Sequence, residues 1–90
     1  MEEFRVPSHV TITFFQDSAV LLDLRKNVYH ALNDTAADFW KLFTQTGSYE
    51  DALQGMLKLY QDSPDLIRKD VEELVFSLAK AGLIEPLKNS

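Results

Sequence analysis

Hydrophobic and polar residues alternate along the first third of the chain, as they do in strands with one buried face. The alternation predicts three strands, over residues 9–15, 19–24 and 28–32. The polar segments between them, residues 16–18 and 25–27, have the composition of tight turns, and Asn27 tolerates a positive φ. Because short strands joined by tight turns pair with their neighbours in opposite directions, the pattern indicates an antiparallel sheet.

After residue 33 the hydrophobic spacing changes to the three-and-four interval that is typical of helices. The new spacing predicts three helices, over residues 34–46, 49–60 and 64–81. Asn33, Ser48 and Ser63 precede them at N-cap positions, where a short polar side chain accepts a hydrogen bond from the first helical turn. Gly47 is suited to end the first helix, because glycine adopts the left-handed conformation found there.

Large hydrophobic side chains on the helices form the predicted core. Phe39, Trp40 and Phe43 recur on one stripe of the first helix, and aromatic side chains of this size dominate small cores. Gly55 interrupts the second helix at a cost of about 1 kcal/mol relative to alanine. We therefore expect another helix to pack closely against Gly55.

Three strands followed by three helices predict an α+β fold. The short helix junctions favour a winged helix-turn-helix-like arrangement, with a three-stranded antiparallel sheet followed by three helices. A sheet of this size needs helices over one of its faces. The 90 residues correspond to one small domain, so we expect a single domain over residues 1–90.

The predicted strand 28–32 is the strongest candidate for a binding site. It runs straight into the helix start at Asn33 and Asp34, and the helix dipole favours the negative charge there. If the strand lies at a sheet edge, its unpaired backbone groups can accept another strand. The sequence therefore predicts a peptide that docks along residues 28–32, with side-chain contacts from the third helix.

Composition excludes several classes of partner. The formal net charge is −5, whereas binding to nucleic acid or to an anionic membrane needs a basic surface. No hydrophobic run approaches the roughly 18 residues of a membrane span. The acidic start of the chain, residues 1–4, does not have the order of a signal peptide. The chain has no cysteine, which fits a cytoplasmic protein.

No residues are arranged for catalysis or for holding a metal or cofactor. The two histidines, His9 and His30, have no further histidine or cysteine at ligand spacing. The serines have no nucleophile context, and the glycines form no phosphate-binding loop. The acidic residues of the third helix are typical of a solvated helix face. We expect a protein that is not an enzyme and has no metal or cofactor.

Binding to DNA is the first hypothesis for a winged helix, and the third helix would be the recognition helix. The polar set considered comprises three bases, three acids and one serine: Arg68, Lys69, Asp70, Glu72, Glu73, Ser77 and Lys80. Such a balanced set is poorly suited to follow phosphates, which supply most of the affinity for DNA. A peptide or protein partner is favoured. A regulatory winged-helix module that binds protein or DNA is the alternative from a different class.

Eight short blocks, in this order, resemble the PqqD-like family of leader-peptide recognition elements, which act in pathways for ribosomally made peptide natural products. The blocks are LLDL at 21–24, VYHALN at 28–33, TAADFW at 35–40, GS at 47–48, AL at 52–53, LY at 59–60, DVEEL at 70–74 and AGLI at 81–84. Within the family, the chain is most similar to the standalone leader-binding proteins of lasso-peptide pathways. It differs from the family at Val28, often a glycine, and at His30, often aromatic.

The resemblance implies that a leader segment adds as an antiparallel strand to residues 28–32 and lies in a groove against the third helix. Such a lasso leader would present a Tyr-x-x-Pro motif. The implied leader-binding residues are Val28, Tyr29, His30, Ala31, Leu32, Arg68, Val71, Glu72, Val75 and Ala79. The helical members share one face, and from the helical angle we expect Leu74 and Leu78 to face the core instead.

The resemblance also implies a non-catalytic protein of antibiotic biosynthesis. It would present the precursor to a separate leader peptidase and to an ATP-using cyclase. Within the family, the alternative is a PqqD-type peptide chaperone for a radical-SAM enzyme. Both a monomer and a strand-swapped dimer are compatible with an exposed strand edge.

Overall fold

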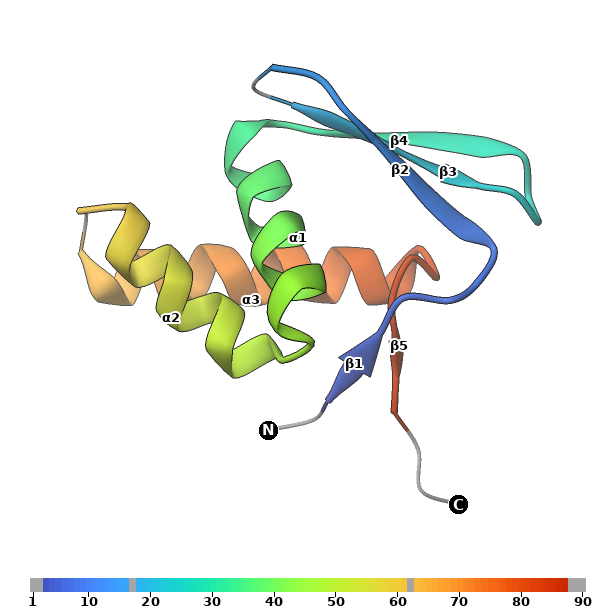
Figure 1. Ribbon diagram of the computed structural model, residues 1–90. Helices are drawn as coiled ribbons and strands as arrows, with labels where there is room; N and C mark the ends of the chain where they lie inside the picture. Colours follow the sequence, from blue (N-terminus) through green and yellow to red (C-terminus); the bar gives the residue numbers. More distant parts are fainter. Residues whose placement is uncertain (1–2, 17, 62, 88–90) are drawn as a thin grey trace.

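The computed structural model describes residues 3–16, 18–61 and 63–87. Its main sheet is antiparallel, with strand order β2 (Val10–Phe14), β3 (Ala19–Asp23), β4 (Val28–Leu32). The helices α1 (Asp34–Thr46), α2 (Tyr49–Leu59) and α3 (Pro64–Lys80) all lie on one side of this sheet (Figure 1). The predicted α+β, winged-helix-like fold is confirmed. The bounds of β4 and α1 are those predicted, β2 is shorter by one residue at each end, and β3, α2 and α3 each end one residue earlier than predicted.

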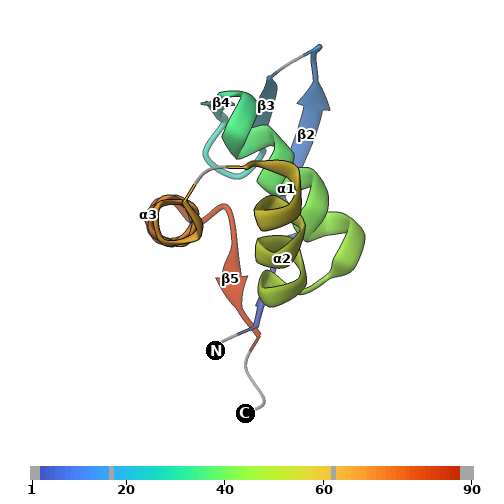
Figure 2. The ribbon, with the colours of Figure 1, turned by 90° about the vertical axis from the view of Figure 1, so that its left-hand side faces the viewer.

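A second, very small sheet was not predicted. It pairs β1 (Phe4–Arg5) with β5 (Glu85–Pro86), and the Arg5 Nε and Glu85 Oε1 atoms are 2.7 Å apart. Strands of two residues are too short to show an alternating pattern, so periodicity could not predict them. The pair brings the two ends of the described chain together, on the far side of the helices from β4 (Figures 1 and 2).

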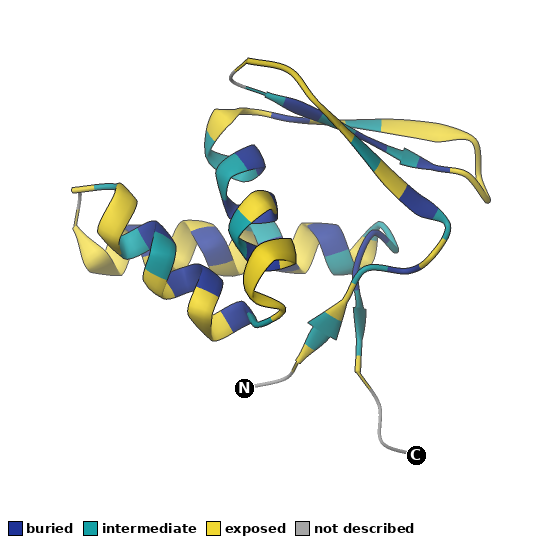
Figure 3. Ribbon diagram, in the orientation of Figure 1, coloured by how far each residue is buried: buried dark blue, intermediate teal, exposed yellow. Residues whose placement is uncertain are grey.

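The core lies between the main sheet and the helices. Phe39, Trp40 and Phe43 are nearly inaccessible, as predicted, and the rings of Phe39 and Phe43 stack with their centroids 5.8 Å apart. The buried positions of β3 alternate with half-buried ones, so one face of the sheet packs on the helices (Figure 3). Leu83 and Ile84, which follow α3, are also buried in this core.

Local signals at the helix ends act largely as predicted. The Asn33 and Ser48 side chains accept hydrogen bonds from the backbone N–H groups of Ala36 and Asp51, at 2.9 and 3.2 Å. Ser63 precedes α3 but its side chain makes no such bond. Gly47 adopts a φ of +72° after α1.

The predicted close contact at Gly55 is confirmed. A Cβ atom at this position of α2 would lie 3.0 Å from the side chain of Leu42 in α1. The absence of a side chain at Gly55 therefore allows the two helices to approach.

Candidate functional site

The strand β4 lies at an edge of the main sheet. It pairs with β3 on one side, and no other described strand of this sheet pairs with it. An edge strand leaves part of its backbone hydrogen-bonding capacity unused, which is the requirement for strand addition. The predicted docking strand is thus in a position to accept a peptide.

Two hydrogen bonds at the ends of the β2–β3 pair determine which backbone groups of β3 point toward β2. The N–H of Leu24 donates to the carbonyl of His9, and the N–H of Phe15 donates to that of Ser18, each at 2.8 Å. In an antiparallel pair, hydrogen-bonded positions alternate with positions that are not bonded. Because Leu24 and Ser18 bond toward β2, the even-numbered residues of β3 between them also face β2. The odd-numbered residues of β3 therefore turn their backbone groups toward β4.

The register of β4 then shows which of its own groups are free. Its residues opposite the odd-numbered positions of β3 are Val28, His30 and Leu32, so these face β3. The backbone N–H and C=O groups of Tyr29 and Ala31 point away from the sheet. Two residues of β4 are therefore available to pair with an added strand.

The side chains of β4 alternate between the two faces of the sheet. Tyr29 is 70% exposed on the outer face, where its cross-strand neighbour is Leu22. His30, opposite the buried Leu21, is half-buried on the helix side, and Leu32 on the same side is buried. A strand added to β4 would extend both faces of the sheet: the exposed outer face, and the inner face that the helices partly cover.

A cavity of about 470 Å³ lies next to the C-terminal end of β4. It is bounded by Asn33, by the start of α1, by the end of α2 and by one flank of α3. The described residues that line it are Asn33, Thr35, Ala36, Met56, Tyr60, Ile67, Asp70, Val71, Glu73, Leu74 and Ser77. The view along the axis of α3 shows β4 above this helix (Figure 2).

The cavity is hydrophobic inside and polar at its rim. Val71 is buried and Leu74 half-buried, whereas Asp70 and Glu73 are exposed. The Tyr60 hydroxyl donates a hydrogen bond to the Asp38 carboxylate at 2.5 Å. This bond, with burial, raises the pKa of Tyr60 above its usual value, so the phenol stays neutral at physiological pH. The arrangement suits a hydrophobic side chain.

Of the predicted α3 residues, only Val71 lines the cavity. Val75 is buried in the core and is 8% exposed. Arg68 and Glu72 are exposed and do not line the cavity. Ala79 also lies outside the cavity lining.

Val75, which was predicted to lie partly at the groove, is thus buried in the core, whereas Leu74 packs against the core and also lines the cavity. Which residues contact a leader stays a prediction. The buried stripe of α3 is centred on Val71, and Leu74 and Ala79 fall on its two flanks at 100° per residue. The sequence gives the position of the stripe but contains no signal for which flank faces β4. The predicted residues Arg68, Glu72 and Ala79 lie on the flank opposite that of Leu74.

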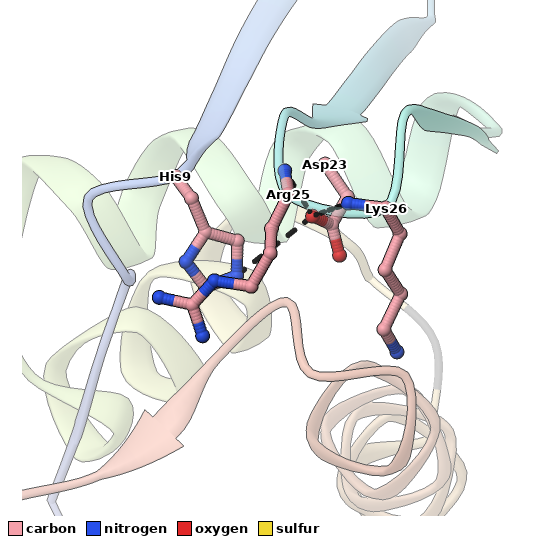
Figure 4. Close-up of polar contacts among 4 residues, drawn as sticks. All are labelled: His9, Asp23, Arg25 and Lys26. Atoms are coloured by element: carbon pink, nitrogen blue, oxygen red, sulfur yellow. Dashed lines mark hydrogen bonds and ion pairs between the residues drawn. The ribbon is translucent and has the colours of Figure 1, made fainter.

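Asp23, in the LLDL block, is a buried structural residue for which the sequence analysis predicted no role. It is 1% exposed, and its Oδ1 atom accepts hydrogen bonds from the N–H groups of Arg25 and Lys26 at 3.0 Å each (Figure 4). His9 Nε2 lies 3.8 Å from the same oxygen. An aspartate directly before a turn often bonds to the backbone two residues later, and this was the available signal. The bonds fix the turn that leads into β4.

The residues described in the structure contain no group of three or more side chains of the types that bind metals. Neither of the histidines therefore belongs to such a cluster in this part of the chain. None of the described helices has the length and hydrophobicity needed to cross a membrane.

Known proteins resemble this chain over nearly its whole length. Residues 18–84 match the family model of coenzyme PQQ synthesis protein D (PqqD). A solved structure of lasso peptide synthetase B1 complexed with the leader peptide is 31% identical, has a TM-score of 0.80, and is matched over 93% of this chain and 99% of its own. The structure of TbiB1 in complex with the TbiA(beta) leader peptide is 20% identical, with a TM-score of 0.85 and coverages of 94% and 99%. No curated protein matches the sequence.

The matched segment contains β3, β4 and the three helices, and so includes the free edge and every described residue that lines the cavity. The family that the short sequence blocks resemble is thus confirmed by a model that covers most of the chain. The chain belongs to the PqqD family.

Proposed function

We propose that this protein binds the leader segment of a ribosomally made precursor peptide and presents it to separate processing enzymes. The observation that carries the proposal is the free edge of β4, with the backbone groups of Tyr29 and Ala31 unpaired beside a hydrophobic cavity. The proposal is supported by the 31% identical relative, a lasso peptide synthetase B1 that was solved with a leader peptide.

The leader would add to β4 as an antiparallel strand. Backbone pairing with Tyr29 and Ala31 would supply affinity with little demand on sequence, and side chains would supply specificity. Because the added strand runs opposite to β4, its N-terminal part would approach Asn33 and the cavity, and its C-terminal part would leave past Val28. A hydrophobic leader side chain would then contact Val71 and Leu74.

We propose a lasso-peptide precursor as the ligand, because the lasso relative is matched over 99% of its own length. The protein would perform no chemistry itself, since its cavity offers hydrophobic contacts and hydrogen bonds but no activated nucleophile. A leader peptidase and a cyclase of the same pathway would act on the bound precursor, in the cytoplasm where the precursor is made.

The substitution Ala31→Pro tests strand addition. It removes an N–H that faces away from β3, and proline is tolerated at such edge positions, so the protein should stay folded. Loss of one backbone bond and the clash of the ring with the added strand should weaken leader binding by about tenfold or more. Fluorescence anisotropy with a labelled lasso leader measures the affinity, and circular dichroism reports the fold.

Ala31→Val is the matched control. It also changes the exposed side chain, but it keeps the N–H and a residue type that favours strands, so binding should persist. If a folded Ala31→Pro variant binds the leader as tightly as wild type, strand addition to β4 is the wrong mode.

A further inference from the structure

The rim of the cavity at the C-terminal end of β4 is acidic. Asp70 and Glu73 of α3 both line it and are exposed to solvent. None of the described residues that line the cavity is basic. The basic residues of this half of α3, Arg68 and Lys69, do not line it. A chain that enters here therefore meets negative charge beside a hydrophobic interior.

The opposite end of β4 is basic. Arg25 and Lys26 are exposed in the turn that precedes Val28, and their backbone bonds to the buried Asp23 hold that turn in place (Figure 4). The carboxylate of Asp23 is 1% exposed and already accepts these two bonds, so a ligand meets the two cations instead. β4 itself separates the basic end from the acidic end by about 14 Å, at about 3.4 Å per residue step.

From this charge separation we infer that the leader has an ordered charge pattern, a step that rests on the proposed function. Basic residues precede the segment that pairs with Tyr29 and Ala31, next to the hydrophobic side chain that enters the cavity. Acidic residues follow the paired segment and lie near Arg25 and Lys26. An antiparallel leader of this kind is attracted at both ends of β4.

The same charges oppose the reverse direction. A leader with this pattern that added parallel to β4 would bring its cations to Arg25 and Lys26 and its acids to Asp70 and Glu73. The pattern therefore selects the direction of the peptide as well as its composition. Because the groups are exposed, each pair changes affinity by at most about fivefold, and the effect weakens as salt is added.

The probes for a test are synthetic peptides on an array. Each peptide has one central segment of strand-forming and hydrophobic residues, drawn from a varied set that includes tyrosine, proline and leucine. Every segment is made twice with the same composition, once with two lysines before it and two glutamates after it, and once with these pairs exchanged. The best-binding segment is then remade with a fluorescent label for anisotropy.

Wild-type protein should bind the lysine-first peptides about fivefold more tightly than the glutamate-first peptides at low salt, and the ratio should fall towards one at high salt. Glu73→Lys should reduce or reverse this preference. Glu50→Lys is the matched control, because it makes the same change at an exposed residue of α2 that does not line the cavity. It should leave the preference unchanged.

Equal binding of the two charge orders, or an equal effect of Glu50→Lys and Glu73→Lys, would overturn the inference. If Ala31→Pro nevertheless abolishes binding of both orders, strand addition survives and only the charge pattern fails. If wild type binds neither order of any segment, the proposed function itself fails.

Discussion

Asp23 illustrates how one buried side chain can position the site without contacting a ligand. The backbone N–H of Lys26, together with that of Arg25, donates to its carboxylate and holds the pKa of Asp23 below its usual 3.8, against the opposing effect of burial. The folded protein therefore favours the ionised form of the Asp23 carboxylate more than the unfolded chain does. The turn that these bonds fix determines where Val28 begins the edge strand.

A pKa that is lowered by folding makes stability depend on pH. The charged Asp23 contributes its full stabilisation above about pH 4, and this contribution is lost as the pH falls through the lower pKa of the folded state. Asp23→Asn keeps an oxygen acceptor but has no charge to lose. Its melting temperature should be lower than that of wild type at neutral pH, and the difference should shrink below pH 4. A difference that stays constant during acid titration would contradict this role for the carboxylate.

At the scale of elements, hydrophobic periodicity was enough to predict most of the fold. Hydrophobic residues at every second position predicted the strands of the main sheet, and hydrophobic residues three and four positions apart predicted the helices. Each spacing reflects which face of the element is buried. The predicted range of β4 was confirmed for the same reason, since Asn33 marks its end by capping α1. The β1–β5 pair was missed because two-residue strands have no pattern to detect.

The two flanks of α3 differ from the sequence prediction in how Leu74 and Val75 are buried, and substitutions at these residues provide a direct test. Val75→Asp places an unpaired charge in the core and should destabilise the protein by more than about 3 kcal/mol. Leu74→Asp changes a half-buried side chain and should cost about 1–2 kcal/mol, while it weakens leader binding about tenfold.

Thermal melting measures the loss of stability and fluorescence anisotropy measures the loss of leader binding. The same substitution is made at two adjacent positions, so the two variants can be compared directly. A stable Val75→Asp variant with impaired binding, together with an unfolded Leu74→Asp variant, would restore the face that the sequence pattern suggested and would contradict the structure.

At the scale of the whole molecule, the candidate site depends on contacts that no single segment encodes. The cavity combines Asn33, the end of α2 and one flank of α3, which are far apart in the sequence. Periodicity places each of these residues on an element but does not determine how the elements pack around a shared space. The bounds of the edge strand β4 could therefore be predicted, whereas the acidic rim beside it could not.

The central claim is that a leader pairs with the backbone of Tyr29 and Ala31, and amide hydrogen exchange measured by NMR tests it most directly. In the free protein these two amides should exchange fast, while those of Val28, His30 and Leu32 are already protected by β3. With a saturating lasso leader, exchange at Tyr29 and Ala31 should slow by about tenfold or more. Ile12, on the outer edge of β2, should not change. Unchanged exchange at Tyr29 and Ala31 while the leader is bound would contradict the account.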